Sequence, residues 1–390
     1  MKIRSVEVVR CPPRWLLLKV ETDNGEVGWG EAIGDLHEEV EAALGAIGER
    51  VTGRYVDGIE RLTQEMRKGR FWRDGPVLNT AISALEMALW DLKGKEFGAP
   101  IHQLLGGAVR DNIRVYRNLW GRNPGEFADS ARSALSEGLT MAKVSPAGPT
   151  ATTPSDADLK DLVSTVAAVR DAMGDHALAI DLHGRLSPAG SRRLLPMLQE
   201  FDLLFVEEPC LPDGSTNHMR DLQELHLSQR IPLATGERLL TRRQFADHLF
   251  PSPVASVIQP DLSLVGGIRA GVEIGSMCET AQVSLAPHCP YGPIQLAASL
   301  QVAAASPAHA FQEFQSLGGA GGGGTPGGGA KWAFDLLEKP FEVTDGMVPV
   351  PNLPGLGIDV KDERIEEHMD KWNPHPPTLW HHADGSHAEW

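Results

Sequence analysis

The chain has 390 residues, and its 36 Lys and Arg residues against 52 Asp and Glu residues give a formal net charge of −16. A chain of this length can bury a full core, and it predicts two or three domains or one large barrel with an attachment. Because an acidic surface repels phosphate backbones and anionic lipid headgroups, we expect neither nucleic acid nor a membrane as a partner.

The cysteines and the N-terminus indicate a soluble protein of a reducing compartment. The four cysteines are far apart in the sequence and form no C-x-x-C motif, which argues against a disulfide scaffold and a structural zinc site. The first residues, MKIRSVEVVRCPPRW, lack the apolar core of a signal peptide. No run approaches the ~18 apolar residues of a membrane span. We therefore expect a cytoplasmic protein.

The first part of the chain has the pattern of an α+β domain. β-forming residues dominate segments 3–10 and 15–32, and Asn24-Gly25 within the second segment predicts a tight turn between two strands. Helical patterns follow at 38–51 and 79–95. Strands followed by helices predict an α+β domain over residues 1–115.

The second helical pattern, 79–95, is the stronger of the two. Its apolar side chains recur at helical spacing, as Ile82, Leu85 and Leu89 illustrate. Asn79 or Thr80 would serve as its N-cap, since a short polar side chain can accept a hydrogen bond from the first helical turn.

From about residue 114 the chain alternates between short apolar runs and helical segments. Eight strand-like runs recur, most of them 25 to 30 residues apart. Repeated βα units of this kind favour a (β/α)-barrel over an open sheet. We place this barrel domain at residues 116–330. We expect residues 331–390 to pack back on the N-terminal domain.

The glycine-rich stretch GGAGGGGTPGGGA at 318–330 follows the last strand-like run. Its composition predicts a disordered surface loop, with a mobile flap near a binding mouth as the alternative.

Side chains that can act in catalysis or metal binding lie at the ends of the apolar runs. They are Lys143, Asp181 with His183, Glu207, Glu237, Asp261, His288 and Glu313. From Asp181 onward the successive steps are 26, 30, 24, 27 and 25 residues, about one βα unit each. Because the carboxyl ends of barrel strands converge on one pocket, we interpret these residues as a catalytic site.

Three of these residues, Asp181, Glu207 and Glu237, are carboxylates on consecutive strands. Ionised carboxylates at close range repel one another, and a hard divalent cation relieves the conflict. Ligands that are all oxygen select magnesium, manganese or calcium over zinc. Of the neighbours Glu207 and Glu208 only one should face the pocket, and we choose Glu207 because Glu208 adjoins Pro209. The alternative is that one or two of these acids pair with Arg or Lys elsewhere.

Two histidines are candidates for proton transfer. Asp181 and His183 are two residues apart and should share a face of a strand. Asp261 ends the run before His288 and could accept a hydrogen bond from its imidazole, which would fix the tautomer and raise the basicity of the ring. A histidine base beside a divalent cation suits removal of a proton next to a carboxylate. A second imidazole permits either dehydration or racemisation, and the strand positions do not decide between them.

Lys143 and Glu313 are assigned supporting roles. Lys143 could hold a substrate carboxylate or an enolate, and the alternative is that it pairs with a ligand carboxylate. Glu313 ends the last strand and could hydrogen-bond an enolate oxygen if it is protonated or assisted by the metal.

These motifs together resemble a known family. The segments D-L-H-G-R at Asp181, V-E-E-P at Glu207, G-E-R at Glu237, Q-P-D at Asp261 and A-P-H-C-P-Y-G-P-I at His288 resemble the enolase superfamily, and within it the acid-sugar dehydratases of the mandelate racemase group. The likeness extends to PPRWLLLKVETDNGEVGWGE near the start, PGLGIDV at 354–360 and LWHHADGSHAEW at the end.

The resemblance implies an N-terminal α+β capping domain on a modified (β/α)7β TIM-type barrel. It implies Mg2+ bound by Asp181, Glu207 and Glu237. His288, made more basic by Asp261, would remove the C2 proton. His183 would assist loss of the 3-hydroxyl, and Glu313 would stabilise the enolate.

The expected substrate is a small sugar acid, with D-galactonate the leading candidate, and the product a 2-keto-3-deoxy acid. We also expect a homo-oligomer. Three alternatives stay open: a dehydratase of another aldonate or aldarate, a racemase or epimerase of a 2-hydroxy acid on the same scaffold, and a binding protein that keeps the fold without catalysis.

Overall fold

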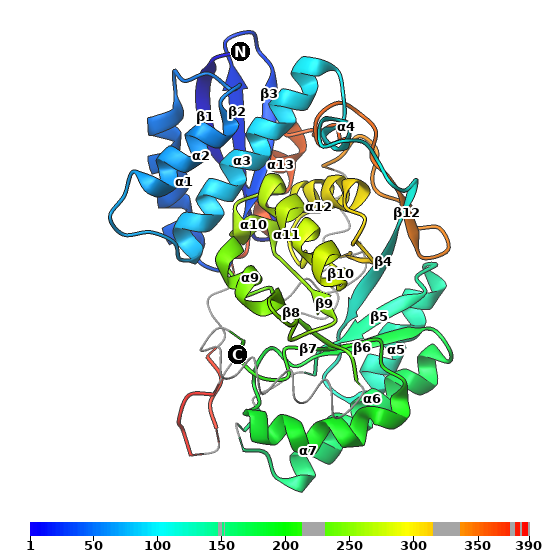
Figure 1. The fold of residues 1–390 in the computed structure, drawn as a ribbon. Helices are drawn as coiled ribbons and strands as arrows, with labels where there is room; N and C mark the ends of the chain where they lie inside the picture. The colour runs from blue at the N-terminus through cyan, green and yellow to red at the C-terminus, as the bar shows by residue number, and fades with distance from the viewer. Residues whose placement is uncertain are drawn as a thin grey trace.

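The computed structural model describes residues 1–146, 150–151, 153–212, 231–314, 336–374, 379–382 and 384–388. Within these residues a small antiparallel sheet with helices stands beside a curled parallel sheet (Figure 1). The predicted fold class is confirmed, because these two parts are the capping domain and the barrel.

The capping domain is built on three strands. β1 (Ile3–Cys11), β2 (Trp15–Thr22) and β3 (Val27–Ala32) form an antiparallel sheet in chain order. Gly25 lies in the predicted turn between β2 and β3 with φ +89°, a conformation that favours glycine.

Three helices complete this domain. They are α1 (His37–Val51), α2 (Ile59–Lys68) and α3 (Pro76–Phe97). Leu16 and Leu18 of β2 are buried in one cluster with Leu85 and Leu89 of α3, so the helical stripe predicted from the sequence faces the sheet.

The helix start predicted at Asn79 or Thr80 is wrong, because α3 begins at Pro76. Proline suits a first turn, since its missing N–H would have no partner there. The two polar side chains are instead buried in bonds to other segments. The Asn79 amide donates to the Leu240 carbonyl at 2.8 Å, and the Thr80 hydroxyl accepts from the Ile33 N–H at 2.9 Å.

The barrel contains eight parallel strands in the described residues. They are β4 (Asn112–Leu119), β5 (Met141–Val144), β6 (Ala177–Asp181), β7 (Val206–Glu207), β8 (Leu233–Thr235), β9 (Val257–Ile258), β10 (Ser284–Leu285) and β11 (Gln312–Glu313). Neighbours in the chain pair in parallel from β4 to β10, and β11 pairs with β4. His309, just before β11, bridges to Leu285 of β10, so the sheet closes on itself.

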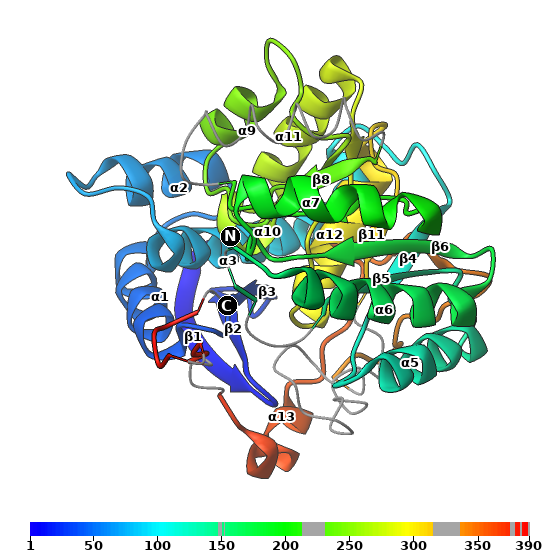
Figure 2. The same ribbon diagram turned by 90° about the horizontal axis from the view of Figure 1, so that it is seen from below.

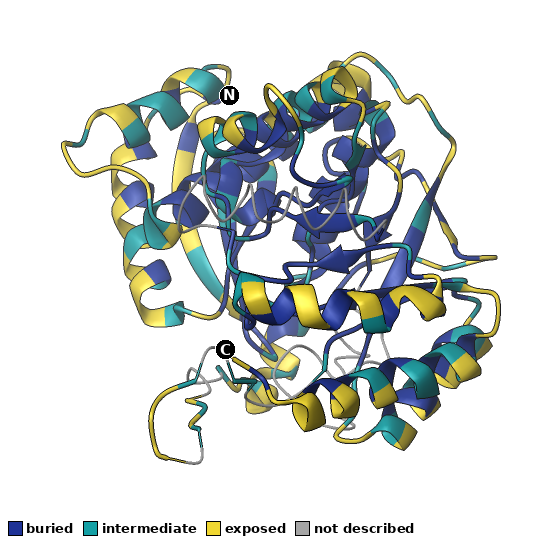
Figure 3. Ribbon diagram, turned by 60° about the horizontal axis from the view of Figure 1, so that its bottom comes forward, coloured by how far each residue is buried: buried dark blue, intermediate teal, exposed yellow. Residues whose placement is uncertain are grey.

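Helices follow the strands and form the outer layer (Figures 2 and 3). The longer ones are α5 (Pro124–Ser136), α6 (Asp156–Met173), α7 (Pro188–Leu198), α9 (Arg242–Leu249), α11 (Ile268–Ala281) and α12 (Pro293–Ala305). Short helices lie at α4 (Ile101–Leu104), α10 (Leu262–Val265) and α13 (Glu363–Glu367). Most of the β7–β8 connection, 213–230, lies outside the described residues.

A layer of apolar side chains fills the inside of the barrel. Every strand segment contributes one buried member: Tyr116, Met141, Ala179, Phe205, Ala234, Val257, Ala286 and Phe311. The rings of Phe205 and Phe311 stack with centroids 5.6 Å apart. The barrel is therefore a packed core, and a site can form only above this layer.

The C-terminal segment 336–374 reaches both parts of the molecule. β12 (Met347–Pro349) pairs antiparallel with β4. The Asn373 N–H donates to the Pro13 carbonyl at 2.8 Å, and Lys19 of β2 pairs with Asp362. The domain division at 115 and 330 stays a prediction. The glycine-rich stretch 318–330 lies outside the described residues.

The four cysteines lie in described segments, and each is a buried free thiol. Among the residues that the structure describes, no helix combines the length and apolar character that crossing a bilayer requires.

Candidate active site

The polar residues at the strand ends lie directly above the apolar layer. Side chains two residues apart on a strand share a face, so a second inward layer should follow the first by two positions. In seven of the eight segments that position is polar: Asn118, Lys143, Asp181, Glu207, Gln259, His288 and Glu313. The fold thus places a polar layer at the mouth of the barrel.

The segment of β8 is the exception. Two residues after Ala234 comes Gly236, with φ +140°, and a Cβ there would lie 2.8 Å from the Gln259 nitrogen. Only glycine fits so close an approach. Glu237, one residue later, supplies the side chain that this strand contributes to the site.

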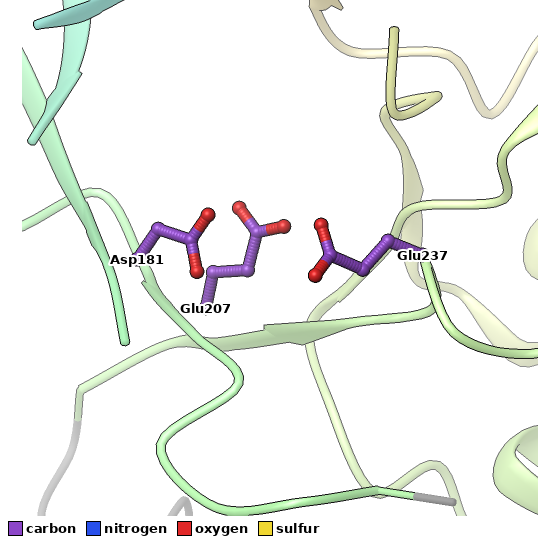
Figure 4. A group of neighbouring side chains, drawn as sticks. All are labelled: Asp181, Glu207 and Glu237. Carbon is purple, nitrogen blue, oxygen red and sulfur yellow. The ribbon is translucent and has the colours of Figure 1, made fainter. Parts of the chain in front are cut away.

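Asp181, Glu207 and Glu237 converge as predicted. One carboxylate oxygen from each lies within 4.8 Å of the others. Figure 4 shows Glu207 between Asp181 and Glu237, with the carboxylates turned toward a common space. All three are buried. Glu207 is the residue that faces the site, as chosen from the sequence, while Glu208 turns to Arg238, whose Nε donates to its Oε2 at 2.8 Å.

Lys143 is buried among the carboxylates. Its Nζ lies 2.6 Å from Glu207 Oε2, 3.1 Å from Asp181 Oδ2 and 3.7 Å from Glu313 Oε1. Burial opposes its charge, but these acids raise the pKa of the Lys143 ammonium well above its ordinary value. The structure agrees with the alternative drawn from the sequence, in which this lysine pairs with ligand carboxylates.

The carboxylate group fits a divalent cation. Burial and the Asp181 charge raise the pKa of Glu207 to about 8. Burial also opposes ionisation of Asp181, but His183 and Lys143 hold its pKa below the ordinary value. Glu207 Oε1 is buried and has no hydrogen-bond partner among the described residues. An all-oxygen set with one orphaned oxygen is the ligand chemistry that Mg2+ takes.

His288 is held between two carboxylates. Its Nδ1 lies 2.9 Å from Asp261 Oδ2, and its Nε2 lies 3.1 Å from Glu237 Oε2. Burial lowers the pKa of His288, but Glu237, Glu313 and Asp261 together raise it well above the ordinary value. Asp261 therefore fixes a tautomer with hydrogen on Nδ1 and leaves Nε2 facing the site.

Asp261 is in turn oriented by its surroundings. Its Oδ1 accepts from the Ser263 N–H and from Gln295 Nε2, each at 2.7 Å. These two bonds turn Oδ2 toward His288. Burial raises the pKa of Asp261, and the bond to His288 counteracts that rise.

His183 lies near Asp181, but not for the reason given from the sequence. β6 ends at Asp181, and His183 has φ +48°, so the alternation of strand faces no longer applies. This left-handed turn brings His183 Nε2 to 3.3 Å from Asp181 Oδ2, and its N–H donates to Asp181 Oδ1 at 2.9 Å. Burial lowers the pKa of His183, against the attraction of Asp181 and Glu237.

Glu313 is held by two donors. Asn118 Nδ2 donates to its Oε1 at 2.5 Å, and the Cys289 N–H donates to its Oε2 at 2.7 Å. Burial raises the pKa of Glu313, but Lys143 and His288 bring it below the ordinary value. Glu313 is therefore a carboxylate here, and it can donate to an enolate only after it gains a proton.

Two polar residues of the site escaped the sequence reasoning. Asn118 donates to Glu313, and Gln259 Nε2 donates to Glu207 Oε2 at 2.8 Å. Both occupy the polar layer, two positions after the apolar one. The signal that would have found them is this two-residue step, applied to every strand and not only to ionisable residues.

The chain is similar to proteins of known family over its whole length. A family model described as "Enolase C-terminal domain-like" matches residues 126–364, and one described as "Mandelate racemase / muconate lactonizing enzyme, N-terminal domain" matches residues 9–106. The D-galactonate dehydratase of Ralstonia pickettii is 38% identical and that of Cronobacter sakazakii 37%, and each alignment covers 100% of both chains.

Solved structures give the same result. A mandelate racemase/muconate lactonizing enzyme from Sulfitobacter sp. superposes with a TM-score of 0.86 at 28% identity, covering 100% of both chains. One from Jannaschia sp. CCS1 gives 0.83 at 30% identity, covering 94% of this chain and 97% of that one. The chain therefore belongs to the mandelate racemase/muconate lactonizing enzyme family of the enolase superfamily, and it is an enzyme of the hydro-lyase class.

Proposed function

We propose that this chain is a Mg2+-dependent sugar-acid dehydratase that converts an aldonate to a 2-keto-3-deoxy acid and water. The observation that carries the proposal is the group of three carboxylates with an imidazole at either side, His183 beside Asp181 and His288 beside Glu237. D-galactonate is the leading candidate substrate, since the curated relatives described above are D-galactonate dehydratases.

His288 is the base in this proposal. Its Nε2 faces the site, while Asp261 holds the hydrogen on Nδ1. Nε2 takes the proton from C2 of the substrate, and the electron pair of the C2–H bond moves toward the substrate carboxylate. Neighbouring negative charge makes the ring a stronger base, as removal of a weakly acidic proton requires.

His183 is the acid. It donates a proton to the 3-hydroxyl, the C3–O bond breaks, and one water leaves. The resulting enol loses the proton of its 2-hydroxyl and gains one at C3, which gives the 2-keto group. Sugar acid thus gives 2-keto-3-deoxy acid plus water, with no oxidant or reductant.

The remaining charges balance the reaction. Asp181, Glu207 and Glu237 would hold Mg2+, which when bound supplies positive charge beside the substrate carboxylate. Lys143 offsets part of the negative charge of the carboxylates, at 2.6 Å from Glu207 and 3.1 Å from Asp181. Glu313, beside Lys143 and His288, is placed to stabilise an enolate oxygen once it carries a proton.

A sugar-acid screen tests this function. Chain stripped with EDTA and reloaded with MgCl2 is incubated in D2O with aldonates and aldarates, D-galactonate among them. Keto acid is detected with semicarbazide and C2–H exchange by proton NMR. We expect keto acid from at least one aldonate, and none from the His288→Asn variant.

Two other outcomes would reject the dehydratase. Exchange of the C2 proton without loss of water would support the racemase or epimerase. Magnesium binding with neither exchange nor keto acid for any sugar acid would support a non-catalytic binding protein.

A further inference from the structure

One guanidinium joins three neighbouring strand ends beside the site. Arg238 follows β8, and its Nε donates to Glu208 Oε2, after β7, at 2.8 Å. Its Nη2 donates to the backbone carbonyl of His183, after β6, at 3.0 Å. The same side chain therefore ties the segment that carries His183 to the two next strands.

The segments that Arg238 joins have unusual backbones. His183 has φ +48° and Glu208 has φ +35°, both in the left-handed region although neither is glycine. Such conformations persist only where surrounding contacts fix them. Two backbone bonds also connect these segments: the Gly184 N–H donates to the Glu208 carbonyl at 2.8 Å, and the Leu182 N–H to the Glu207 carbonyl at 3.0 Å.

Glu208 anchors the guanidinium. Its side chain is fully buried, Oε1 has no hydrogen-bond partner among the described residues, and Oε2 accepts from Arg238 Nε. The planar fork of an arginine can reach the carboxylate and the carbonyl at once, whereas an ammonium is a point charge. The arrangement uses a property of arginine beyond its charge.

The turn at His183 decides where its imidazole points. The backbone N–H of His183 is fixed by Asp181 on one side of the residue, and its carbonyl is fixed by Arg238 on the other. The Arg238 bond fixes the carbonyl itself, and the Gly184 N–H bond to the Glu208 carbonyl holds the residue that follows. A displacement of about 1 Å in a proton donor costs on the order of 100-fold in rate.

We infer that Arg238, anchored by Glu208, is a positioning residue that holds His183 in place as the acid for loss of the 3-hydroxyl. The inference rests on the proposed function and adds to it a residue that acts through another. It separates the two half-reactions, because Arg238 bonds the His183 backbone, whereas Asp261 and Glu237 hold His288.

The partition of the intermediate tests the inference. The Arg238→Lys variant keeps the positive charge beside Glu208 but loses the fork. In D2O with saturating MgCl2 and D-galactonate, or the aldonate that the screen identifies, we expect kcat for keto acid to fall about 10- to 100-fold. Incorporation of deuterium at C2 of the unreacted substrate should rise at least about tenfold relative to the keto acid formed, because His288 still removes the C2 proton. KM should change little.

A second variant and a matched control exclude a general structural effect. Glu208→Gln keeps Arg238 but weakens its anchor, and we expect a smaller shift of the partition in the same direction. Arg170→Lys is the control: Arg170 also bonds backbone carbonyls, those of Phe201, Gly174, His176 and Asp202, ahead of the strand starts. It should leave the ratio unchanged.

Metal binding needs its own readout, since Arg238 Nε also lies 3.9 Å from Glu237 Oε1. The Mg2+ concentration for half-maximal activity should differ by less than about threefold in Arg238→Lys. A loss of exchange and keto acid in equal proportion, or a fall that higher Mg2+ repairs, would overturn the inference.

A crystal structure of Arg238→Lys decides the matter independently of turnover. We expect the turn at His183 to change, with loss of the contact between its imidazole and Asp181. If the positive φ and that contact are retained, the inference is wrong. If the wild-type chain dehydrates no sugar acid, the proposed function fails, whatever this structure shows.

Discussion

Two regions of the molecule bury carboxylates, and they satisfy them in different ways. At the barrel mouth, Asp181, Glu207 and Glu237 crowd within 4.8 Å of one another, and Glu207 keeps one oxygen without a partner in the described residues. Between the capping domain and the barrel, Glu31 and Glu86 are also buried, but backbone N–H groups bond both oxygens of each.

In the second region the hydrogen-bond donors are backbone N–H groups at the starts of two helices. Glu31 of β3 accepts from the N–H groups of Gly292 and Gln295 at 2.5 and 2.9 Å, where α12 begins. Glu86 of α3 accepts from Ile268 and Arg269 at 2.7 and 2.9 Å, where α11 begins. The first N–H groups of a helix have no partner within it, and the helix dipole favours a negative charge there.

The difference separates carboxylates that support the fold from carboxylates that are free to take a ligand. Glu31 and Glu86 complete two barrel helices with groups from the capping domain, so they hold the two domains together and need no ligand. The carboxylates at the mouth crowd together, share the single ammonium of Lys143 and leave Glu207 Oε1 without a partner in the described residues, so they are suited to a cation. Burial alone identifies neither kind, whereas the donors around each oxygen distinguish them.

The largest expected effect is a loss of activity in a variant of the barrel mouth that a variant of the domain junction does not show. The His288→Asn variant should lose both keto-acid formation and C2 exchange by at least about 1,000-fold, since a general base contributes on the order of 100- to 10,000-fold. Glu86→Gln should keep kcat within about threefold, although Glu86 is equally buried. NMR in D2O measures both reactions. A Glu86 variant as inactive as His288→Asn would refute the division.

Thermal stability without metal gives a second comparison between the two regions. In EDTA, Glu207→Gln should unfold at the same temperature as wild type or higher, because the amide oxygen can keep the bonds from Lys143 and Gln259 while a crowded charge disappears. The free energy of unfolding of Glu31→Gln should be lower than that of wild type by about 1–3 kcal/mol, and its midpoint should fall accordingly, since one amide oxygen cannot satisfy two N–H groups.

Addition of MgCl2 should then raise the wild-type midpoint and raise that of Glu207→Gln much less, because binding to the folded state stabilises it. Differential scanning fluorimetry measures the midpoints of all three proteins in EDTA and those of wild type and Glu207→Gln with MgCl2. An equal rise in both proteins would mean that Glu207 is not a ligand.

A smaller effect is expected at Asp261. Asp261→Asn removes one of the negative charges that raise the pKa of His288. The base must be neutral to accept a proton, so the acidic limb of kcat/KM should move to lower pH while the maximal rate falls about tenfold with the weaker base. A pH–rate profile checks this, and an acidic limb that moves to higher pH would contradict the assignment.

The smallest effect concerns pH and the junction between the domains. Burial raises the pKa of Glu86 to about 7 from an ordinary 4.5, despite its bonds to Arg269 and Ile268. A raised pKa favours the protonated folded state, so this stabilisation is complete below about pH 4.5 and is lost as the pH rises through 7.

The free-energy difference between wild type and Glu86→Gln should therefore shrink from pH 5 to pH 8, by about 3 kcal/mol at most. Urea unfolding without metal at the two pH values measures it. A difference that grows with pH would show that Glu86 is ionised throughout.

The sequence predicted the barrel because its strands alternate with helices at a regular spacing. It also predicted the convergence of the three carboxylates, since Asp181 and Glu207 end the strands β6 and β7. The alternation of side chains along a strand depends only on residues that are neighbours in the sequence, so it can be recognised without knowledge of distant contacts.

Other features depend on contacts between distant segments. The turn at His183 is fixed by Asp181 and Arg238, and a strand pattern cannot show it. The start of α3 was misjudged because Asn79 bonds the Leu240 carbonyl, 161 residues away, and does not cap its own helix. Lys143 could be interpreted in two ways until its distances to three carboxylates were known.

The account depends on the three carboxylates binding one divalent cation, and calorimetric titration of Mg2+ into EDTA-stripped chain measures this directly. Wild type should bind one ion per chain, and Asp181→Asn, Glu207→Gln and Glu237→Gln should each lose that binding, while Glu86→Gln retains it. Binding that survives in all three variants, or its absence from folded wild-type chain, would contradict the account.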